Sequence, residues 1–353
     1  MQTNIRYSKY GIAVYDRNKK ILLDPNTENP CDFTFISHAH SDHLIKKTNR
    51  KYFKSKMLTS KATCLIAESR GYKIDNFIEE HKGFELVDSG HIVGSKGLLI
   101  EDDIYYTGDI SIRERGFMKP AKLPRADTLI IESTFGKPEY IFPNITDILH
   151  KANNIISELY DRGIPVILMG YSLGKAQLLT ELFANWEPIY LHGSIQKMNS
   201  IYKELGIPLI DTISHTDALS QGLLSKNKPW IMIAPLTHCN NNFVKLMKST
   251  YGAITIGFSG WAIDKRYKFA MGLDYALPLS DHCDFCELVK VVEQCKPKKV
   301  YTCHGFASEF SSSLRNIGFD AEPIFNTKTP KSKSIYNIKN LAMPTNYCLD
   351  MYM

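Results

Sequence analysis

The sequence predicts an α/β protein, and three observations lead to this fold class. The 353 residues are 44% hydrophobic and 23% charged, which provides for a packed core and excludes general disorder. Short β-rich runs separated by turn residues fill most of the chain before residue 135. After residue 145, strand-like runs alternate with helical periods, a pattern typical of parallel β-α-β pairing. The length corresponds to one large domain or two ordinary ones.

The first part of the chain is expected to contain hairpins and single strands. The turns Asp16-Arg17-Asn18 and Asp102-Asp103 each separate two β-rich runs, which is a hairpin signal. The expected elements are strands at 11–15 and 20–24, a strand at 32–37, a helix at 60–70, strands at 96–100 and 104–107, and an apolar strand at 128–131.

The second part is expected to alternate helices and strands before the chain returns to one last strand. Apolar residues recur with helical spacing in 145–160 and again in 285–295. The expected elements are helices at 145–160, 174–184 and 285–295, strands at 165–169, 230–234 and 253–257, and a strand that ends at His304. The tail from 326 to 353 is rich in Lys, Ser, Thr and Asn, and we expect it to follow the surface or fray.

Composition narrows the class of protein but does not identify a partner. No apolar run approaches the about 20 residues that a membrane helix needs, and the N-terminus lacks the apolar stretch of a signal peptide. Eight scattered cysteines are too few for a disulfide scaffold. We therefore expect a cytoplasmic protein. Lys and Arg exceed Asp and Glu by 43 to 37, a surplus compatible with a polyanion partner but not requiring one.

A cluster of histidines points to a metal site. His38, His40, Asp42 and His43 lie within six residues, directly after the expected strand 32–37. Imidazole and carboxylate groups are ligands for Zn, Mn or Fe, and a strand-to-loop corner lets neighbouring side chains turn toward one point. A solvated polar loop is the alternative, but three histidines and an aspartate at this spacing rarely arise by chance.

Further candidate ligands follow at strand ends and between glycines. His91 lies between Gly90 and Gly94, where the backbone can approach a metal closely, and Asp109 ends an expected strand. On its own, a histidine or aspartate in such a place is more often a cap or a hydrogen-bond anchor. His304 follows an apolar strand in the same way that Asp109 does.

In this order, the residues resemble the ligand series of the metallo-β-lactamase superfamily. The His-x-His-x-Asp-His motif is followed by single His and Asp motifs, and Asp24 matches the aspartate of the first motif. Three further motifs resemble those of the β-CASP nucleases: Glu132 after an apolar strand, His282 in the turn Ser280-Asp281-His282-Cys283-Asp284, and the pair His304-Gly305. Leu173-Gly174-Lys175-Ala176-Gln177 resembles the helix start typical of the β-CASP insert.

The resemblance covers roughly residues 5–320 and implies one domain interrupted by another. We expect a metallo-β-lactamase αββα sandwich built from 1–144 and 259–325, and an inserted β-CASP α/β domain at 145–258. Within the family, the pattern is most similar to small archaeal RNA-processing exonucleases, and bacterial ligase-associated DNA exonucleases share much of it.

The resemblance also implies a dinuclear metal site. We expect two Zn²⁺ ions, with Mn²⁺ as the alternative metal. One ion is assigned to His38, His40, His91 and Asp109, and the other to Asp42, His43, Asp109 and His304. The last ligand is placed at His304 and not at His150, because His150 lies in an expected helix. Asp24 is expected to orient ligands without being one.

Other residues receive chemical roles by the same resemblance. Asp42, His282 and Glu132 are the expected catalytic residues; His282 is the general acid, and Glu132 keeps it protonated and oriented. The alternative for His282 is a helix-start residue that caps its own backbone. Lys175 and Ser259 are candidate phosphate-binding residues, although a glycine turn that opens a packed helix explains the segment around Lys175 equally well.

The implied function is hydrolysis of RNA phosphodiester bonds, by exonuclease or endonuclease action. Single-stranded RNA is the first expected substrate, because His304 stands where many DNA-specific relatives have valine. A DNA exonuclease of the ligase-associated repair type is the alternative. A small-molecule lactonase or thioesterase would need its last ligand nearer Asp109 and no large insert, and an inactive scaffold subunit would have lost ligands. A homodimer or partner proteins are expected to add affinity for long substrates.

Overall fold

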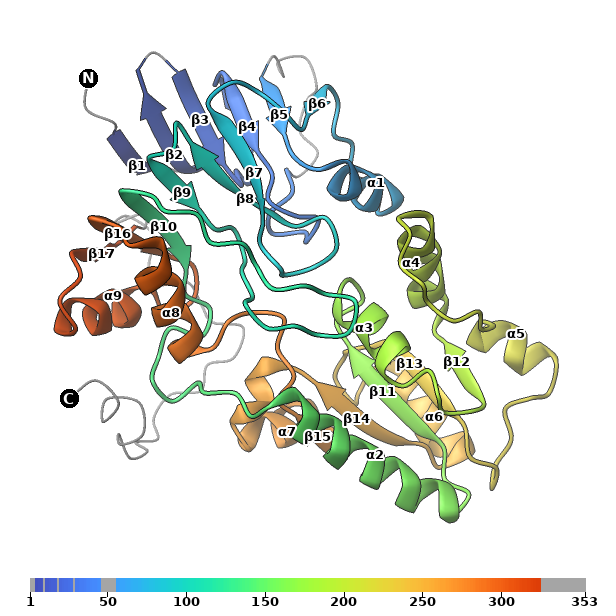
Figure 1. Ribbon diagram of the computed structural model, residues 1–353. Helices are drawn as coiled ribbons and strands as arrows, with labels where there is room; N and C mark the ends of the chain where they lie inside the picture. The colour runs from blue at the N-terminus through green and yellow to red at the C-terminus, as the bar shows by residue number, and fades with distance from the viewer. Residues whose placement is uncertain (1–3, 9, 18, 28, 46–54, 325–353) are drawn as a thin grey trace.

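The structure of the protein is a computed structural model that describes residues 4–8, 10–17, 19–27, 29–45 and 55–324 (Figure 1). The expected tail at 326–353 lies outside the described residues.

Two six-stranded sheets form one end of the molecule. The first has the order β1 (Asn4–Ser8), β2 (Gly11–Asp16), β3 (Lys19–Leu23), β4 (Phe33–Phe35), β5 (Lys56–Leu58) and β6 (Phe77–Ile78). The second has the order β17 (Ala321–Pro323), β16 (Lys299–Cys303), β10 (Thr128–Glu132), β9 (Ile104–Tyr106), β8 (Lys96–Ile100) and β7 (Phe84–Asp88). Both sheets mix parallel and antiparallel pairs.

The two sheets pack face to face through alternate residues of their strands. Val14 and Phe35 from the first sheet share a buried cluster with Tyr106 and Ile130 from the second. The rings of Phe35 and Tyr106 meet edge to face at 6.0 Å between centroids. Outside this sandwich, α1 (Lys61–Ser69) packs near Met57 of β5, while α8 (Phe285–Cys295) and α9 (Ala307–Asn316) cover the second sheet.

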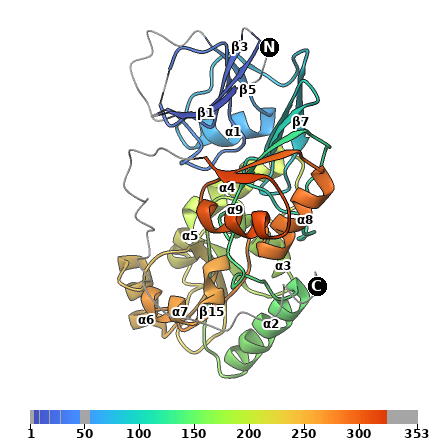
Figure 2. The same cartoon turned by 90° about the vertical axis from the view of Figure 1, so that its left-hand side faces the viewer.

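A third sheet forms a separate layer with helices on both faces. It is wholly parallel, in the order β12 (Ile189–Leu191), β13 (Ile231–Pro235), β11 (Val166–Gly170), β14 (Ile254–Phe258) and β15 (Tyr275–Leu277). Its helices are α2 (Ile145–Asp161), α3 (Lys175–Leu182), α4 (Gly193–Glu204), α5 (His215–Ser220), α6 (Asn242–Tyr251) and α7 (Arg266–Met271), with a short 3₁₀ helix η2 (Gly260–Ile263). In both views α2, α6 and α7 lie at the opposite end of the molecule from β1 and β3 (Figures 1 and 2).

The position of β11 at the centre of the third sheet explains why its sequence is apolar throughout. Val166 and Leu168 face the cluster that includes α2 and α3, whereas Ile167 and Met169 face the cluster that includes α6 and α7. A strand covered on both sides reads as a continuous apolar run, because neither face meets water.

The observed elements confirm the α/β class and most of the expected elements. The helix expected at 285–295 is α8, which begins at a capping box between Asp284 and Glu287. One boundary differs: we expected the inserted segment to end at 258, but β15 pairs with β14 and extends the third sheet to Leu277. A strand of three residues has too few positions to reveal a two-residue period. Among the described residues, every helix falls short of the length and apolar character of a membrane span.

The packing of α8 against the second sheet can be tested by shortening one buried side chain. Leu288 is fully buried in the cluster between α8 and the second sheet, so Leu288→Ala should lower the free energy of unfolding by about 2–5 kcal/mol. Gln294→Ala, at an exposed position of the same helix, should change it by less than about 0.5 kcal/mol. Equilibrium denaturation of both variants measures the difference; equal stabilities would contradict the placement of α8.

Candidate metal centre

Strand ends carry most of the candidate site. His38 and His43 lie in the loop after β4, Asp109 follows β9, Glu132 ends β10, and His304 follows β16. Because β9, β10 and β16 are parallel neighbours, their carboxyl ends lie at one edge of the second sheet. Residues that are up to 266 positions apart, from His38 to His304, therefore reach one region.

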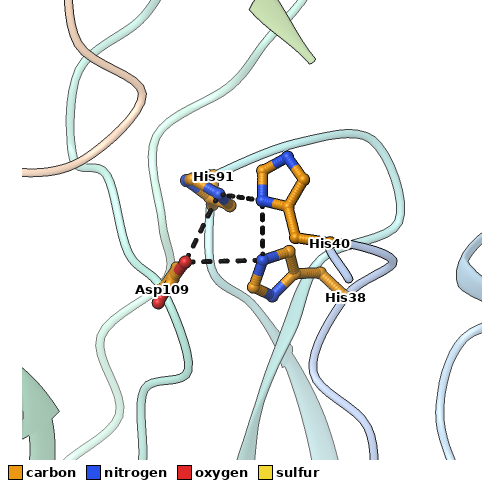
Figure 3. A group of neighbouring side chains, drawn as sticks. All are labelled: His38, His40, His91 and Asp109. Carbon is orange, nitrogen blue, oxygen red and sulfur yellow. Dashed lines mark hydrogen bonds and ion pairs between the residues drawn. The ribbon is translucent and has the colours of Figure 1, made fainter. Parts of the chain in front are cut away.

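The structure brings four of the predicted ligands into one compact group (Figure 3). His38, His40, His91 and Asp109 each offer a ligand atom, and these atoms lie within 4.8 Å of one another. Asp109 Oδ2 is 3.4 Å from His38 Nε2 and 3.6 Å from His91 Nε2. His40 Nδ1 is 3.0 Å from His38 Nε2 and 3.2 Å from His91 Nε2.

The hydrogen bonds around His38 determine which of its ring nitrogens carries the proton. Ser37 Oγ donates to Asp24 Oδ2 at 2.6 Å, so its lone pair accepts from His38 Nδ1 at 2.9 Å. The proton of neutral His38 is thus on Nδ1, and the lone pair of Nε2 points into the group.

His40 and His91 are oriented by backbone carbonyls in the same way. His40 Nε2 donates to the carbonyl of Leu173 at 3.2 Å, which leaves the lone pair on Nδ1. His91 Nδ1 donates to the carbonyl of Asp281 at 2.9 Å, which leaves the lone pair on Nε2. Leu173 lies in the loop between β11 and α3, so the third sheet supplies one of these carbonyls.

The resulting donor set fits a metal ion. Burial lowers the pKa of His38, His40 and His91, so these imidazoles are neutral, the form that binds metal. Their three free lone pairs meet at hydrogen-bond distance beside one carboxylate. Such lone pairs repel one another, and a cation between them turns the repulsion into coordination.

The Asp24 carboxylate accepts several hydrogen bonds from residues next to this group. It is buried and accepts from Ser37 N at 2.7 Å, from Tyr106 Oη at 2.9 Å and from His43 Nδ1 at 2.8 Å. Burial alone would lower the pKa of His43, but the carboxylates of Asp109 and Asp24 outweigh it and raise that pKa to about 10. Asp24 thus contacts the predicted ligand His43 and lies outside the group of lone pairs.

The second predicted ligand group lies next to the first but is more open. His43 Nε2 is 3.5 Å from Asp109 Oδ2 and 3.8 Å from Asp42 Oδ2, and the Asp42 side chain is 78% exposed. The His304 ring stacks on His43 at 5.4 Å between centroids, and its backbone has a positive φ of 56°. Asp42 and His304 thus both lie beside His43, but among the described residues these three side chains do not form a compact metal-binding group with Asp109.

His282 and Glu132 form an ion pair beside Asp109, and the His282 ring lies 4.5 Å from the His91 ring between centroids. His282 Nδ1 is 2.8 Å from Glu132 Oε1, and Glu132 also accepts from the backbone N–H groups of Ile110 and Thr134 at 3.0 Å each. Burial alone would lower the pKa of His282, but Glu132 raises it to about 9. Burial raises the pKa of Glu132, yet His282 and the hydrogen bonds bring it to about 2. The His282 side chain is 22% exposed, so the imidazole reaches the surface.

Lys175 and Ser259 are placed differently from the expectation that they contact phosphate. Lys175 is only 1% exposed, and its Nζ lies 2.8 Å from Asp281 Oδ1. Burial lowers the pKa of Lys175 to about 8, although Asp281 counteracts this effect. Ser259 is fully buried, and its Oγ accepts from Trp261 N at 3.3 Å as the cap of η2. Neither side chain is available to a phosphate in this arrangement.

Sequence reasoning missed several residues that hold the site together. Arg115 is buried and donates to Asp281 Oδ1 at 2.9 Å and to the carbonyl of His91 at 3.2 Å. Nothing in the sequence distinguishes Arg115 from other basic residues of a loop. In the sequence, Asp281 is visible only as part of the turn around His282, and the role of Leu173 depends on its backbone alone.

Comparison with known proteins supports the motif assignment. No protein-family model matches the sequence. The chain is 33% identical over 304 residues to a probable DNA ligase of Opitutus terrae, in an alignment that covers 82% of this chain but 28% of that protein. It is 24% identical over 373 aligned positions to the RNase J-like protein of Methanocaldococcus jannaschii, with 83% of this chain and 89% of that protein covered.

A solved structure is similar in fold. A protein of unknown function from Enterococcus faecalis V583 matches with a TM-score of 0.57 and 16% identity, over 85% of this chain and 92% of that one. At this identity the match supports the mixed α/β fold alone. The motif series and the related sequences together show that the chain belongs to the β-CASP nuclease family of the metallo-β-lactamase superfamily.

Proposed function

We propose that the chain is a zinc-dependent nuclease that hydrolyses phosphodiester bonds of nucleic acid by a two-metal mechanism. The observation that carries this proposal is that Asp109 belongs to two groups of side chains. Asp109 forms one compact group with the unprotonated nitrogens of His38, His40 and His91, and a second compact group with the ion pair of His282 and Glu132.

The fold is proposed to follow the family pattern. The two facing sheets with α1, α8 and α9 correspond to the αββα sandwich, and the third sheet with its helices corresponds to the β-CASP insert. The loop after β11 of the third sheet contacts the proposed metal centre directly, because the carbonyl of Leu173 accepts from His40.

The metal ligands are proposed as expected from the family. His38, His40, His91 and Asp109 hold one Zn²⁺, and Asp42, His43, Asp109 and His304 hold the other, with Mn²⁺ as the alternative ion. Bound zinc supplies Lewis acidity, which lowers the pKa of water and neutralises charge on phosphoryl oxygens.

His282 is proposed to protonate the leaving oxygen. Its Nδ1 proton is held by Glu132, so its Nε2 proton is the one that can be transferred. Glu132 is buried and anchored by two backbone N–H groups, so it fixes the direction in which the imidazole points.

RNA and DNA are both candidate substrates. The RNase J-like relative and His304 favour single-stranded RNA. The higher identity to part of a probable DNA ligase favours a DNA exonuclease instead. The two share one chemistry, so the choice between them is a separate experiment.

Removing the proposed acid should separate catalysis from metal binding. His282→Ala should lower kcat by about 10²- to 10⁴-fold, because the leaving oxygen loses its proton donor. The zinc content by elemental analysis should stay unchanged. His150→Ala, on the exposed face of α2, is the matched control and should cleave normally. Loss of zinc in His282→Ala would mean that His282 is a ligand.

Removing the shared carboxylate should release metal. In Asp109→Asn an amide replaces the oxygen that lies 3.4–3.6 Å from three histidine nitrogens, so zinc affinity should fall. The loss of zinc affinity should exceed about 100-fold, because removing even a residue that only orients a ligand lowers metal affinity by about 10- to 100-fold. Asp127→Asn, in an exposed pair with Lys298, is the control. Unchanged zinc binding in a folded Asp109→Asn protein would contradict the assigned site.

The substrate is decided by matched oligonucleotides. One zinc-loaded preparation is given end-labelled single-stranded RNA and DNA of the same sequence, each with a 5′-phosphate or a 5′-hydroxyl. Preference for RNA supports RNA processing, and preference for DNA supports the ligase-associated type. His282→Ala, tested in parallel, shows whether any cleavage comes from a contaminating nuclease. Failure to cleave either polymer would contradict the nuclease proposal.

A further inference from the structure

We infer that Arg115, Lys175 and Asp281 form a buried ion triad whose role is to position His91, and that zinc affinity at the group of His38, His40, His91 and Asp109 depends on it. This inference rests on the proposed metal site, but not on the identity of the substrate. The three members are positioning residues, because they act on a ligand and do not touch the proposed substrate.

The triad joins three distant segments of the chain. Asp281 Oδ1 accepts from Arg115 Nη1 at 2.9 Å and from Lys175 Nζ at 2.8 Å. Arg115 lies in the segment after β9, and Asp281 lies between β15 and α8. Lys175 is the first residue of α3, which packs on the third sheet. The side chains of Arg115 and Lys175 are 1% exposed and that of Asp281 is 7% exposed, so the triad is shielded from water.

The triad surrounds the backbone of His91. Arg115 Nη2 donates to the carbonyl of Gly90 and to the carbonyl of His91 itself. These two carbonyls lie on either side of the His91 α-carbon. The Asp281 backbone carbonyl accepts from His91 Nδ1 and thereby keeps the lone pair of Nε2 directed at the metal group. The side chain of Asp281 is fixed by the two cations, so they also fix the carbonyl that orients the ligand.

The same contact brings the third sheet to His40. Leu173, two residues before Lys175, supplies the carbonyl that accepts from His40 Nε2 at 3.2 Å. Between them, Gly174 has φ of 88°, and a Cβ added there would lie 2.4 Å from Ile92 Cγ2. The start of α3 therefore packs directly against the loop that carries His91. The ion pair of Lys175 with Asp281 holds it in this position.

The energetics favour positioning over stabilisation. A buried ion pair pays a large desolvation penalty, so its net contribution to folding is often small. Two cations around one carboxylate leave one positive charge in excess, which stabilises the fold even less. Such a network favours one defined geometry, because displacing Asp281 would leave two buried cations without a counter-charge.

The decisive variant is Lys175→Met in the full-length protein. It removes the surplus cation and leaves Asp281 paired with Arg115, so the protein should fold. Zinc affinity, measured by competition with a chromophoric chelator, should fall about 10- to 100-fold, the loss usual for a partner behind a ligand. Lys203 lies in α4 and forms an exposed ion pair with Asp211, so Lys203→Met is the matched control and should bind zinc normally.

Asp281→Asn provides the second variant. It keeps the backbone carbonyl used by His91 and removes only the charge that holds the two cations; Asp211→Asn is its control. The same loss of zinc affinity is expected, with the KM for a cleaved oligonucleotide unchanged. Because the first measurement uses zinc alone, a protein that cleaves no nucleic acid would still test the inference.

Three results would overturn the inference. The first is wild-type zinc affinity in both folded variants. The second is a raised KM in Lys175→Met with zinc affinity and kcat retained, which would mean that Lys175 binds phosphate. The third is unfolding of both variants by circular dichroism, which would give the triad a role in overall stability.

Discussion

Three imidazole nitrogens without protons meet beside the Asp109 carboxylate, and the surrounding structure is arranged to keep them there. A neutral imidazole ring can rotate, or its proton can move from one ring nitrogen to the other. A hydrogen bond from the nitrogen that does not face the metal group prevents both. Here each imidazole is held by a different partner, Ser37 in the first sheet's loop, Leu173 beside the third sheet and Asp281 before α8. The donor set therefore exists only when all parts of the chain have come together.

This dependence explains the layered architecture. The second sheet alone gathers Asp109, Glu132 and the segment before His304 at one edge, because its parallel strands end there. It cannot orient His40, whose partner comes from the third sheet. The loop that follows β11 is thus part of the candidate metal centre. The third sheet has apolar clusters on both faces, since β11 packs against helices on each side.

The parts of the site that are local in sequence could be predicted, and those that arise from tertiary contacts could not. His38, His40 and His43 lie in one loop, so their clustering is visible in the residues themselves. The helix α8 was also visible, because its capping box and apolar spacing are both local. The ion pair of Arg115 with Asp281 and the hydrogen bond from His40 to the Leu173 carbonyl both join residues more than 100 positions apart. Lys175 was assigned to phosphate because the sequence shows a helix start but not the carboxylate that folds against it.

The Leu173 carbonyl has a consequence for how the family can diverge. A backbone acceptor is present whatever side chain stands at its position, so substitution there leaves the hydrogen bond to His40 intact. What the contact does constrain is the number of residues between β11 and α3, since one insertion would shift the carbonyl by roughly 3.3–3.6 Å along the chain. Selection at this link should act on loop length, and alignments scored by residue identity alone would overlook it.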